Sequence, residues 1–502
     1  MSLAMDTTTA LVFLSSACAL FTFFFFLGGE TAKKKSVNLP PTPPKLPIIG
    51  NFHQFSFLLH HALRLLSNKH GPLMLLYQCH IPTLIVSSQE TAEEVMKTHD
   101  LVFANRPHNY AAKHLLYDGK DILFSSYGQY WREARKICML QLLSLKRISS
   151  FQPIIEEEIA ATIKLISRSC PTSSVIDLRL VLQLLFSGII SRVALGKKYG
   201  GIKEFLEALK EMGELLGAVR VGDYFPSFAW VDVLTGFDGK MKRVSRNMDT
   251  FLDRVVKDRE EMDGRDGNQH KDFVDTLRQL EKDSGQLTRD SIKAIVLDMF
   301  AGSEFITMTT EWAMAELMKH PDIMVKAQEE VRRLVGRKPK VEVEDIHQMH
   351  YLKCIIKETL RLHPPGPLLG PRESNDNTTI QGYHIPQNTR VIINAWAISR
   401  DPKSWKCPEE FLPERFANNS IDFKGHDFQF IPFGAGRRMC PGASFAIHII
   451  EFVLTDLLRY FDWELPNGAT AEDLEMAEEG GIISPKEISL HLVPICHFPL
   501  CD

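Results

Sequence analysis

The sequence predicts one large, mainly helical domain with a minor β region, preceded by an N-terminal membrane-anchor helix. Three observations lead to this fold class. An uncharged apolar run lies near the N-terminus, amphipathic helical patterns dominate the rest, and no composition shift, long linker or internal repeat divides the residues after Asn51. A chain of 502 residues can bury a sizeable core. We therefore expect an anchor over 1–32, a basic and proline-rich hinge over 33–50 and a globular domain over 51–502.

The apolar run is long enough to cross a bilayer. It extends from Ala10 to Gly29 without a charged residue, and a helix of that length spans roughly 30 Å, the thickness of the hydrocarbon core. Lysines follow at 33–35, so the positive-inside rule predicts a single pass with the globular domain in the cytosol. The alternative is a cleaved signal peptide, but such peptides carry their positive charge before a shorter apolar run. The prolines from Pro40 to Pro47 predict a stiff, extended spacer.

The composition excludes several classes of protein. Lys and Arg number 58 against 62 Asp and Glu, and a net charge of −4 lacks the basic face that nucleic-acid binding requires. Nine widely spread cysteines do not form a disulfide scaffold, which favours a reducing compartment. Cys496 and His497 have no matching second pair, and His60 and His61 are typical of a solvated surface doublet, so we expect no metal at either place.

Within the globular domain, amphipathic periodicity predicts helices and short apolar runs predict strands. The expected helices cover 89–98, 126–144, 152–168, 203–217, 240–262, 289–319, 321–336, 351–362 and 443–459. The expected strands cover 73–77, 83–87, 390–394 and a stretch near 488–493. The polar, glycine-containing segment 263–271 predicts a surface loop.

The most specific chemistry lies in the segment FGAGRRMCPG, residues 433–442. Its one cysteine, Cys440, lies among glycines and precedes the helical run 443–459, where free N–H groups favour a thiolate. Because the backbone can approach the sulfur closely, this pattern favours an axial metal ligand over a structural cysteine. Gly434 and Gly436 lack the third glycine of a dinucleotide fingerprint, so we expect no nicotinamide site in this chain.

Two further pairs share helix faces. Glu358 and Arg361 are three residues apart in an otherwise apolar helix and can pair with each other. Trp131 and Arg135 are four residues apart, so an indole N–H and a guanidinium could both bind a carboxylate. Taken alone, either pair is also compatible with an ordinary amphipathic helix.

The helix 289–319 is unusually long and has an unusual middle. Thr288 is a suitable N-cap and Pro321 follows the end, so the helix would span roughly 46 Å. Gly302 weakens a helix but lets a flat cofactor lie against the backbone. Glu304 places a carboxylate in an apolar helix interior, which is costly and usually serves a purpose.

These motifs resemble those of the cytochromes P-450. Residues 433–442 match the family's haem-binding pattern F-x-x-G-x-R-x-C-x-G at every fixed position. The resemblance implies that Cys440 is the axial ligand of haem iron and that 51–502 is a haem-thiolate catalytic domain. It also implies a wider cofactor-binding set of Trp131, Arg135, Arg372, Phe433, Gly436 and Arg438. Glu358-x-x-Arg361 matches the family's E-x-x-R, and Arg415 of FLPERF would complete a buried structural network with them.

The helix 289–319 resembles the family's oxygen-binding helix but departs from it at one position. Glu304 fills the acidic position, whereas the next residue, normally a threonine that helps to deliver protons to dioxygen, is Phe305. Glu311-Trp312 aligns with the usual downstream pair, so no shift of register restores the threonine. Three interpretations remain open: a substrate hydroxyl or water carries the protons, Phe305 shapes the pocket, or the enzyme performs less usual chemistry. We take Gly302, Glu304 and Phe305 as the catalytic group.

The resemblance covers essentially the whole chain and is strongest to the plant A-type group, endoplasmic-reticulum enzymes of specialised metabolism. It implies haem b, reduced by electrons from NADPH through a separate NADPH–cytochrome reductase, with cytochrome b5 as a second candidate donor and Arg132 and Lys136 as candidate docking residues. The implied reaction inserts one atom of O2 into a small apolar terpenoid, phenolic, coumarin or alkaloid. The alternatives are cyclisation, desaturation, dehydration or rearrangement on the same scaffold, and a non-catalytic membrane haem protein. The expected pocket segments are 103–123, 302–305, 366–370 and 480–483.

Overall fold

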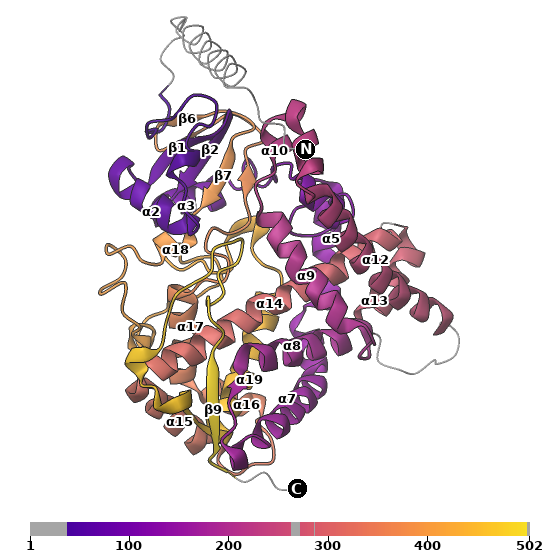
Figure 1. The fold of residues 1–502 in the computed structure, drawn as a ribbon, viewed down its shortest axis with the longest axis vertical. Coiled ribbons are helices and arrows are strands. Elements are labelled where there is room, and N and C mark those ends of the chain that lie inside the picture. Colours follow the sequence, from indigo (N-terminus) through magenta and orange to yellow (C-terminus); the bar gives the residue numbers. More distant parts are fainter. Residues whose placement is uncertain (1–37, 263–271, 286, 499–502) are drawn as a thin grey trace, which may run out of the picture.

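The structure is a computed structural model that describes residues 38–262, 272–285 and 287–498. The predicted anchor over 1–32, the lysines of the hinge and the predicted loop 263–271 lie outside these residues and stay predictions. The described chain is mainly helical, and its short strands form small sheets (Figure 1). The predicted fold class is therefore confirmed.

Helices are the dominant secondary structure of the described chain. They are α2 (Leu59–His70), α3 (Gln89–Glu93), α4 (Tyr110–Leu115), α5 (Gln129–Ile137), α6 (Leu145–Ser150), α7 (Gln152–Ser167), α8 (Leu178–Leu195), α9 (Ile202–Gly217), α10 (Val221–Tyr224), α11 (Trp230–Leu234), α12 (Phe237–Met262), α13 (Phe273–Ser284), α14 (Arg289–Lys319), α15 (Pro321–Val335), α16 (Val343–Gln348), α17 (His350–Leu362), α18 (Ala395–Ile398) and α19 (Ala443–Tyr460).

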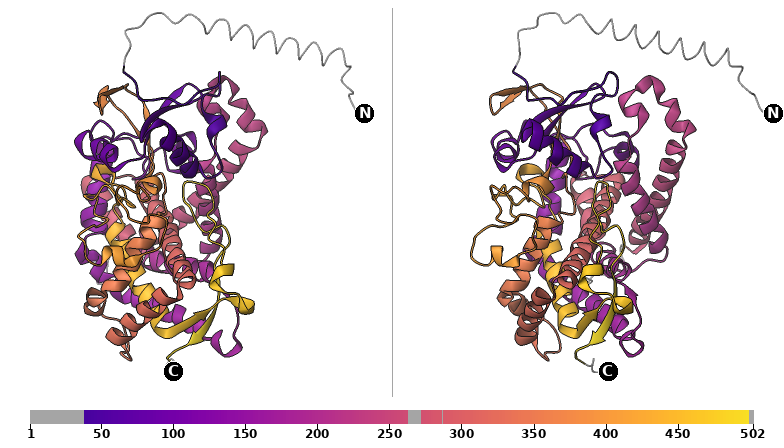
Figure 2. Two further views of the ribbon diagram at one scale, coloured as in Figure 1. Left: turned by 90° about the vertical axis from the view of Figure 1, so that its left-hand side faces the viewer. Right: turned by 60° about the vertical axis from the view of Figure 1, so that its left-hand side comes forward.

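The strands are short and lie at two ends of the molecule. They are β1 (Leu73–Gln78), β2 (Ile81–Val86), β3 (Ile176–Asp177), β4 (Arg372–Glu373), β5 (Thr378–Ile380), β6 (Tyr383–Ile385), β7 (Arg390–Ile393), β8 (Phe461–Glu464) and β9 (His491–Cys496). The largest sheet has the order β1-β2-β7-β4. It lies at the opposite end of the molecule from the C-terminal strand β9 (Figures 1 and 2).

The largest sheet is covered on both faces, which explains why its strands are apolar nearly throughout. β1 and β2 pair antiparallel with Leu73 opposite Val86 and Met74 opposite Ile85. Because side chains alternate between faces, Leu73 and Val86 join one hydrophobic cluster while Met74 and Ile85 join another. β2 then pairs parallel with β7, bringing residues 81–86 and 390–393 together.

The helix α14 runs through the centre of the helical body (Figure 1) and has the bounds predicted from the sequence. Thr288 caps it, since its hydroxyl accepts from Ser291 N at 3.3 Å. The helices α8, α17 and α19 all pack against it. Its side chains therefore contribute to the walls of any internal site.

The helix α8 was not predicted, and its absence from the prediction has a physical reason. Apolar residues surround nearly its whole circumference, so no amphipathic periodicity marks it. Among the described residues it is the one helix long and apolar enough to cross a membrane, but 67% of it is buried inside the molecule. It is a core helix of the globular domain.

Other sequence predictions differ from the structure in detail. The helices expected over 89–98 and 126–144 each end in a π-helical turn, η2 (Glu94–Thr98) and η3 (Cys138–Leu142). From Asn38 onward the proline-rich segment is attached to the domain, because Pro41 O accepts from Leu75 N at 2.9 Å. Within the described residues the segment is thus attached at an edge of the sheet region.

Candidate functional site

The loop that carries Cys440 is closed on itself just before α19. Cys440 N donates to Phe433 O at 2.9 Å, which joins the two ends of the loop. Gly434 and Gly436 have φ of +71° and +67°, a left-handed conformation that glycine adopts at little cost. A Cβ on Gly436 would lie 2.2 Å from Met96 O, so no larger residue fits there. The glycines therefore fix the position of the sulfur.

Cys440 keeps part of its surface accessible, although protein atoms surround it densely. Burial raises the pKa of the Cys440 thiol, while the backbone N–H groups of Gly442 and Ala443 and the guanidinium of Arg135 lower it. The effect of burial on the thiol pKa is larger than that of these groups, so the helix N-terminus and Arg135 do not produce a thiolate by themselves. A bound metal cation would supply the missing positive charge.

Largely buried arginines gather beside this loop. Burial and the neighbouring Arg372 lower the pKa of Arg438 to about 9, with Arg135 acting in the same direction and Asp121 opposing it. Burial and the same arginines hold the pKa of Arg106 well below its usual range. Buried cations that repel one another fit an anionic partner with more than one negative charge, such as the two propionates of haem.

Backbone carbonyls hold these guanidinium groups in place. Arg438 donates to Ala104 O at 2.7 Å and to Ser125 O at 2.6 Å. Arg372 donates to Ala435 O at 2.9 Å, and Arg135 donates to Met439 O at 2.6 Å. The sequence-predicted Arg135, Arg372 and Arg438 thus all contact segments in or around the cysteine loop.

Trp131 lies beside Arg135, whose guanidinium is 5.4 Å from the indole ring. The indole N–H of Trp131 donates to Ile122 O at 3.0 Å. Its ring lies 4.1 Å from the guanidinium of Arg438. Trp131 therefore supports the arginine cluster through a buried cation–π contact.

On α14, Gly302 leaves open space beside the helix. A Cβ built there would meet no atom within 4 Å apart from its own helix backbone. Phe305 is half-buried, and its Cε1 lies 3.7 Å from the position of a Cβ on Gly366, in the turn after α17. The structure thus brings 302–305 and 366–370 together, as expected for two pocket segments.

The hydroxyls of Thr307 and Thr309, which follow Phe305 on α14, are bonded within the helix. Thr307 donates to Ser303 O at 3.0 Å, and Thr309 donates to Phe305 O at 2.9 Å. Both hydroxyls are bonded to the carbonyl four residues earlier, so their protons are directed along the helix.

Glu304 faces α8. Gln183 Nε2 donates to its carboxylate at 3.4 Å, a long hydrogen bond. Burial raises the pKa of Glu304, while Gln183, Lys210 and Arg179 act in the opposite direction. The carboxyl can therefore hold a proton at higher pH than a surface glutamate, which suits a group that passes protons.

The structure brings Glu358, Arg361 and Arg415 into one network. Arg361 donates to both Glu358 oxygens, at 2.7 and 2.8 Å, and Arg415 Nε donates to Glu358 at 2.9 Å. The side chains of Glu358 and Arg361 are fully buried. Arg361 also donates to Ser399 O at 2.8 Å and Pro408 O at 2.7 Å, so the network ties α17 to the segment that leads to the cysteine loop.

The sequence analysis missed Arg106 and a pair of buried carboxyl groups. Asp298 on α14 accepts from Ile122 N at 2.6 Å, and Asp121 accepts from Phe124 N at 2.5 Å. Burial and the nearby Asp121 raise the pKa of Asp298 well above its usual range, so the two groups do not both ionise readily. Asp298 stands one helical turn before Gly302, and this spacing was the available signal. Nothing in its local sequence distinguishes Arg106 from a surface arginine.

One further expectation was wrong. His60 does not belong to a solvated doublet, because it is 1% exposed and its Nε2 lies 2.9 Å from a carboxylate oxygen of Glu478. His61 Nε2 lies 2.5 Å from the same oxygen.

Comparisons with known proteins agree with this geometry. The family model described as Cytochrome P450 matches residues 40–492. Cytochrome P450 71A1 of Persea americana is 56% identical over 89% of this chain and 91% of its own length. Desmethylyatein synthase of Sinopodophyllum hexandrum is 48% identical over 91% and 94%, and strychnine-11-hydroxylase of Strychnos nux-vomica is 44% identical over 97% and 98%.

A solved structure shares the fold. The zebra fish cytochrome P450 solved with abiraterone superposes with a TM-score of 0.72 at 24% identity, over 88% of this chain and 100% of that chain.

Proposed function

This chain belongs to the cytochrome P450 family and is a haem-dependent monooxygenase, and from that premise we propose that it oxidises a small apolar plant specialised metabolite, with Cys440 as the ligand of haem iron. The family's haem b is held by a cysteine thiolate and receives its electrons from a reductase. The observation that carries the assignment of Cys440 is its position in a glycine-fixed loop beside buried arginines.

Two independent features of the site fit haem b. Arg106, Arg135, Arg372 and Arg438 offer a buried cationic cluster for two propionates, and the open side of Gly302 accepts a flat group. When bound, haem b activates dioxygen for insertion of one oxygen atom. Trp131 and the backbone carbonyls hold the guanidinium groups in place.

Protons reach the reaction, we propose, from Glu304 through water or a substrate hydroxyl. Glu304 is the partly buried carboxyl next to Phe305, and burial raises its pKa, so it holds a proton at higher pH than a surface glutamate does. Phe305 acts as a wall of the pocket against Gly366. A substrate held there would be selected by shape.

A specific observation favours a second candidate reaction. Phe305 has no hydroxyl, and those of Thr307 and Thr309 are bonded within α14. A pocket without this hydroxyl is compatible with cyclisation, desaturation, dehydration or rearrangement, with no new oxygen in the product.

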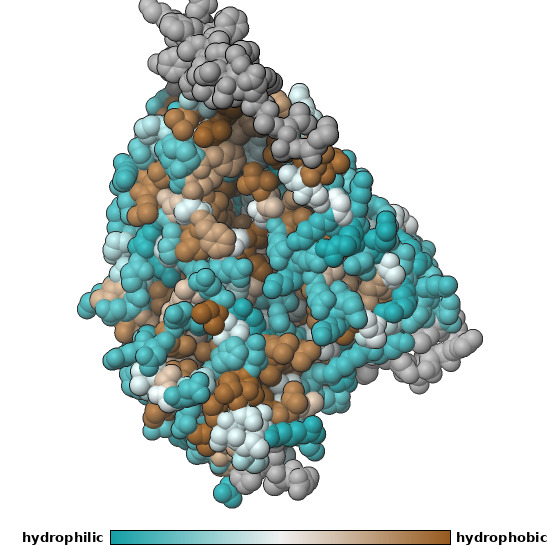
Figure 3. Space-filling model, viewed as in Figure 1, coloured by the Kyte–Doolittle hydropathy of each residue, from teal (hydrophilic) through white to brown (hydrophobic). Residues whose placement is uncertain are grey.

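We also propose that the chain is a single-pass protein of the endoplasmic-reticulum membrane with a cytosolic catalytic domain. Exposed apolar side chains support contact with lipid, and Figure 3 shows apolar side chains at the end of the molecule that carries the largest sheet. They come from the proline-rich segment and from 219–234, namely Leu46, Ile48, Ile49, Val219, Phe228, Trp230, Val233 and Leu234. The two segments are neighbours, because Phe52 packs edge-on against Tyr224 with ring centroids 5.1 Å apart.

The reductase would dock on α5, which lies beside the cysteine loop. Arg132 and Lys136 are exposed there, while Arg135 on the same helix contacts Met439 O next to Cys440. A short path from that surface to the sulfur, together with positive charge, suits an acidic electron donor such as a reductase or cytochrome b5.

The product formed under labelled dioxygen tests the proposal. Membranes that contain the full chain and a reductase are given a panel of terpenoids, coumarins and alkaloids, with Phe305→Thr run alongside. One labelled oxygen atom in the product supports a monooxygenase that manages protons without the threonine. An unlabelled product that forms only with NADPH and oxygen supports the second candidate reaction. If no compound is converted and none raises NADPH consumption above that of the reductase alone, both candidate reactions are contradicted.

A further inference from the structure

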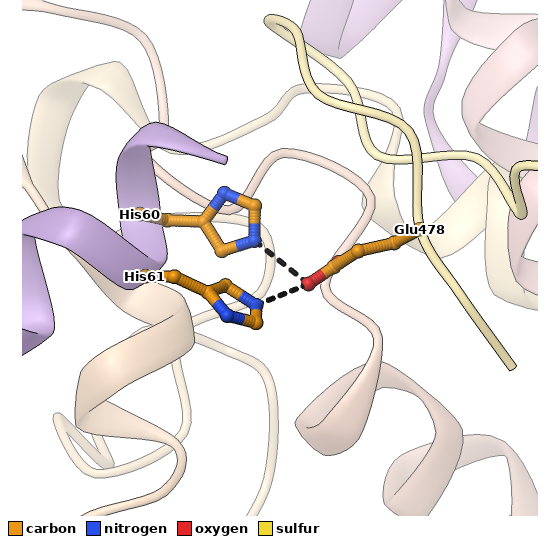
Figure 4. Close-up of side chains that lie close together, drawn as sticks. All are labelled: His60, His61 and Glu478. Carbon is orange, nitrogen blue, oxygen red and sulfur yellow. Dashed lines mark hydrogen bonds and ion pairs between the residues drawn. The ribbon is translucent and has the colours of Figure 1, made fainter. Parts of the chain in front are cut away.

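A second cluster of titratable groups lies outside the cysteine site and joins two distant parts of the chain. His60 and His61 belong to the first turn of α2, and Glu478 belongs to the segment that precedes β9. Both imidazole rings point toward one carboxylate oxygen, Glu478 Oε1, with Nε2 atoms at 2.9 Å and 2.5 Å (Figure 4). Hydrogen bonds to a carboxylate are among the stronger ones in proteins.

The α2 side of this cluster is held firmly. His60 O accepts from Asn394 Nδ2 at 2.8 Å, and the oxygen of that side chain caps α18 by accepting from Ala397 N at 3.0 Å. The ring of His61 lies 4.1 Å from the ring of Trp396, which also contacts His60 edge-on at 5.1 Å. The imidazole groups therefore have fixed positions to which Glu478 attaches.

Glu478 begins a hairpin, defined here as residues 478–486. Glu478 and Lys486 form an antiparallel bridge, and Glu479 N donates to Pro485 O at 2.9 Å. Within the hairpin, Ser484 N donates to Pro365 O at 3.1 Å, just before Gly366 and the turn that faces Phe305. The hairpin thus carries the predicted pocket segment 480–483.

The tip of this hairpin is closely packed. A Cβ on Gly480 would lie 2.3 Å from Phe57 O, and one on Gly217, at the end of α9, would lie 3.4 Å from Ile482 Cγ1. Trp312 on α14 donates to Ser484 O at 3.2 Å. A shift of Glu478 would therefore move backbone that touches α9 and α14 together.

We propose that His60, His61 and Glu478 form a latch that holds the hairpin against α2, and that the latch thereby fixes the position of Ile482 and Ile483 in the wall of the substrate pocket. The three are positioning residues for the reaction, and this role rests on the proposed function. They act through backbone geometry and do not themselves touch the cofactor.

The charges around the latch support a carboxylate bound by imidazoles rather than a metal site. Two more cations lie nearby: the guanidinium of Arg400 is 4.0 Å from the ring of Trp396, and that of Arg64 is 5.3 Å from it. Burial and the proximity of these cations disfavour a divalent ion. Burial alone would raise the pKa of Glu478, yet its hydrogen bonds to His60 and His61 lower it to about 2, so the carboxylate stays ionised.

The test compares three variants of the haem-loaded full chain. Glu478→Ala removes the acceptor, Glu478→Gln keeps an oxygen that accepts from both imidazoles, and Glu479→Ala removes a neighbouring exposed carboxylate of equal charge. Hydrogen–deuterium exchange follows residues 475–488, and 4-phenylimidazole, which binds haem iron, reports pocket shape through the dissociation constant obtained from its absorbance shift.

We expect Glu478→Ala to speed amide exchange in the hairpin and to weaken binding of the probe, each by about tenfold, the equivalent of one charge-assisted hydrogen bond. Glu478→Gln should restore most of both, and Glu479→Ala should change neither. The latch is refuted if Glu478→Ala matches Glu479→Ala in both measurements. One equivalent of bound zinc that disappears in Glu478→Ala would overturn it in favour of a metal site. A thiolate-type carbon-monoxide spectrum that is missing from the unaltered chain would instead overturn the proposed function, while hydrogen exchange, which needs no catalysis, still decides on the latch.

Discussion

Removal of the Glu358 carboxylate is predicted to be strongly destabilising. In Glu358→Ala, four hydrogen bonds disappear together: two from Arg361 at 2.7 and 2.8 Å, one from Arg415 at 2.9 Å and one from Leu412 N at 2.8 Å. The guanidinium of Arg361, whose side chain is 0% exposed, would keep only backbone carbonyls as partners. Breaking a buried ion pair by removing one partner costs about 3–5 kcal/mol, a large part of the free energy of unfolding of a typical domain.

The measurement is unfolding in urea followed by tryptophan fluorescence, with free energies extrapolated to water. The matched control is Glu414→Ala in the same turn region, where an exposed carboxylate pairs with Lys326 at 3.2 Å. An exposed pair contributes about 1 kcal/mol or less. If Glu358→Ala costs no more than Glu414→Ala, the network does not stabilise the fold and the reasoning from burial is wrong.

Three other substitutions test the site and its surroundings. Arg372→Ala should lower the haem-to-protein ratio after gel filtration about tenfold more than Arg437→Ala, because Arg372 is buried beside the cysteine loop and Arg437 is exposed; equal ratios would contradict haem binding by the buried arginine cluster. Burial raises the pKa of Glu304, so Glu304→Gln should change the dependence of product formation on pH; an unchanged pH profile would remove Glu304 from the proton path. Burial raises the pKa of Glu451 to about 7, so the folded protein keeps a proton on Glu451 at pH values where the unfolded chain has released it, and stability falls as pH rises from the ordinary pKa to about 7. Glu451→Gln should therefore raise the free energy of unfolding by about 1–3 kcal/mol at pH about 8 and leave it unchanged at pH about 4; an equal gain at both would refute the assignment.

The parts of the fold that the sequence predicted well are those with local signals. α14 has its predicted bounds because Thr288 caps it and Pro321 follows its end. The strands β1 and β2 were predicted within one or two residues, since they are short apolar runs. α8 was missed because a helix apolar on every side has no periodicity to detect.

The residues of the candidate site likewise divide into those with a local sequence signal and those without one. The segment with Cys440 and the pair Glu358–Arg361 carry their chemistry in residue spacing, so sequence could name them. Arg106 joins the cluster only because the chain folds its segment against Arg438 and Arg372. The contact between His60 and Glu478 links residues 418 apart, and no local pattern reports such a distance.

The direction of the pKa shift of Cys440 also could not be predicted without the three-dimensional structure. The sequence shows the helix start and the nearby arginines, which lower a thiol pKa. It does not show how much protein surrounds the sulfur, and burial turns the net effect upward. The same holds for Trp131, whose spacing from Arg135 is visible while its hydrogen bond to Ile122 O is not.

The most direct test of the central claim is the carbon-monoxide difference spectrum of the reduced, haem-loaded chain beside that of Cys440→Ala and Cys407→Ala. Both thiols are exposed, but only Cys440 lies in the glycine-fixed loop beside the buried arginines. We predict the red-shifted band of a thiolate-ligated haem for the unaltered chain and for Cys407→Ala, and its complete loss in Cys440→Ala. A red-shifted band that persists in Cys440→Ala would contradict the assignment of Cys440 and, with it, the account of how this chain holds its haem.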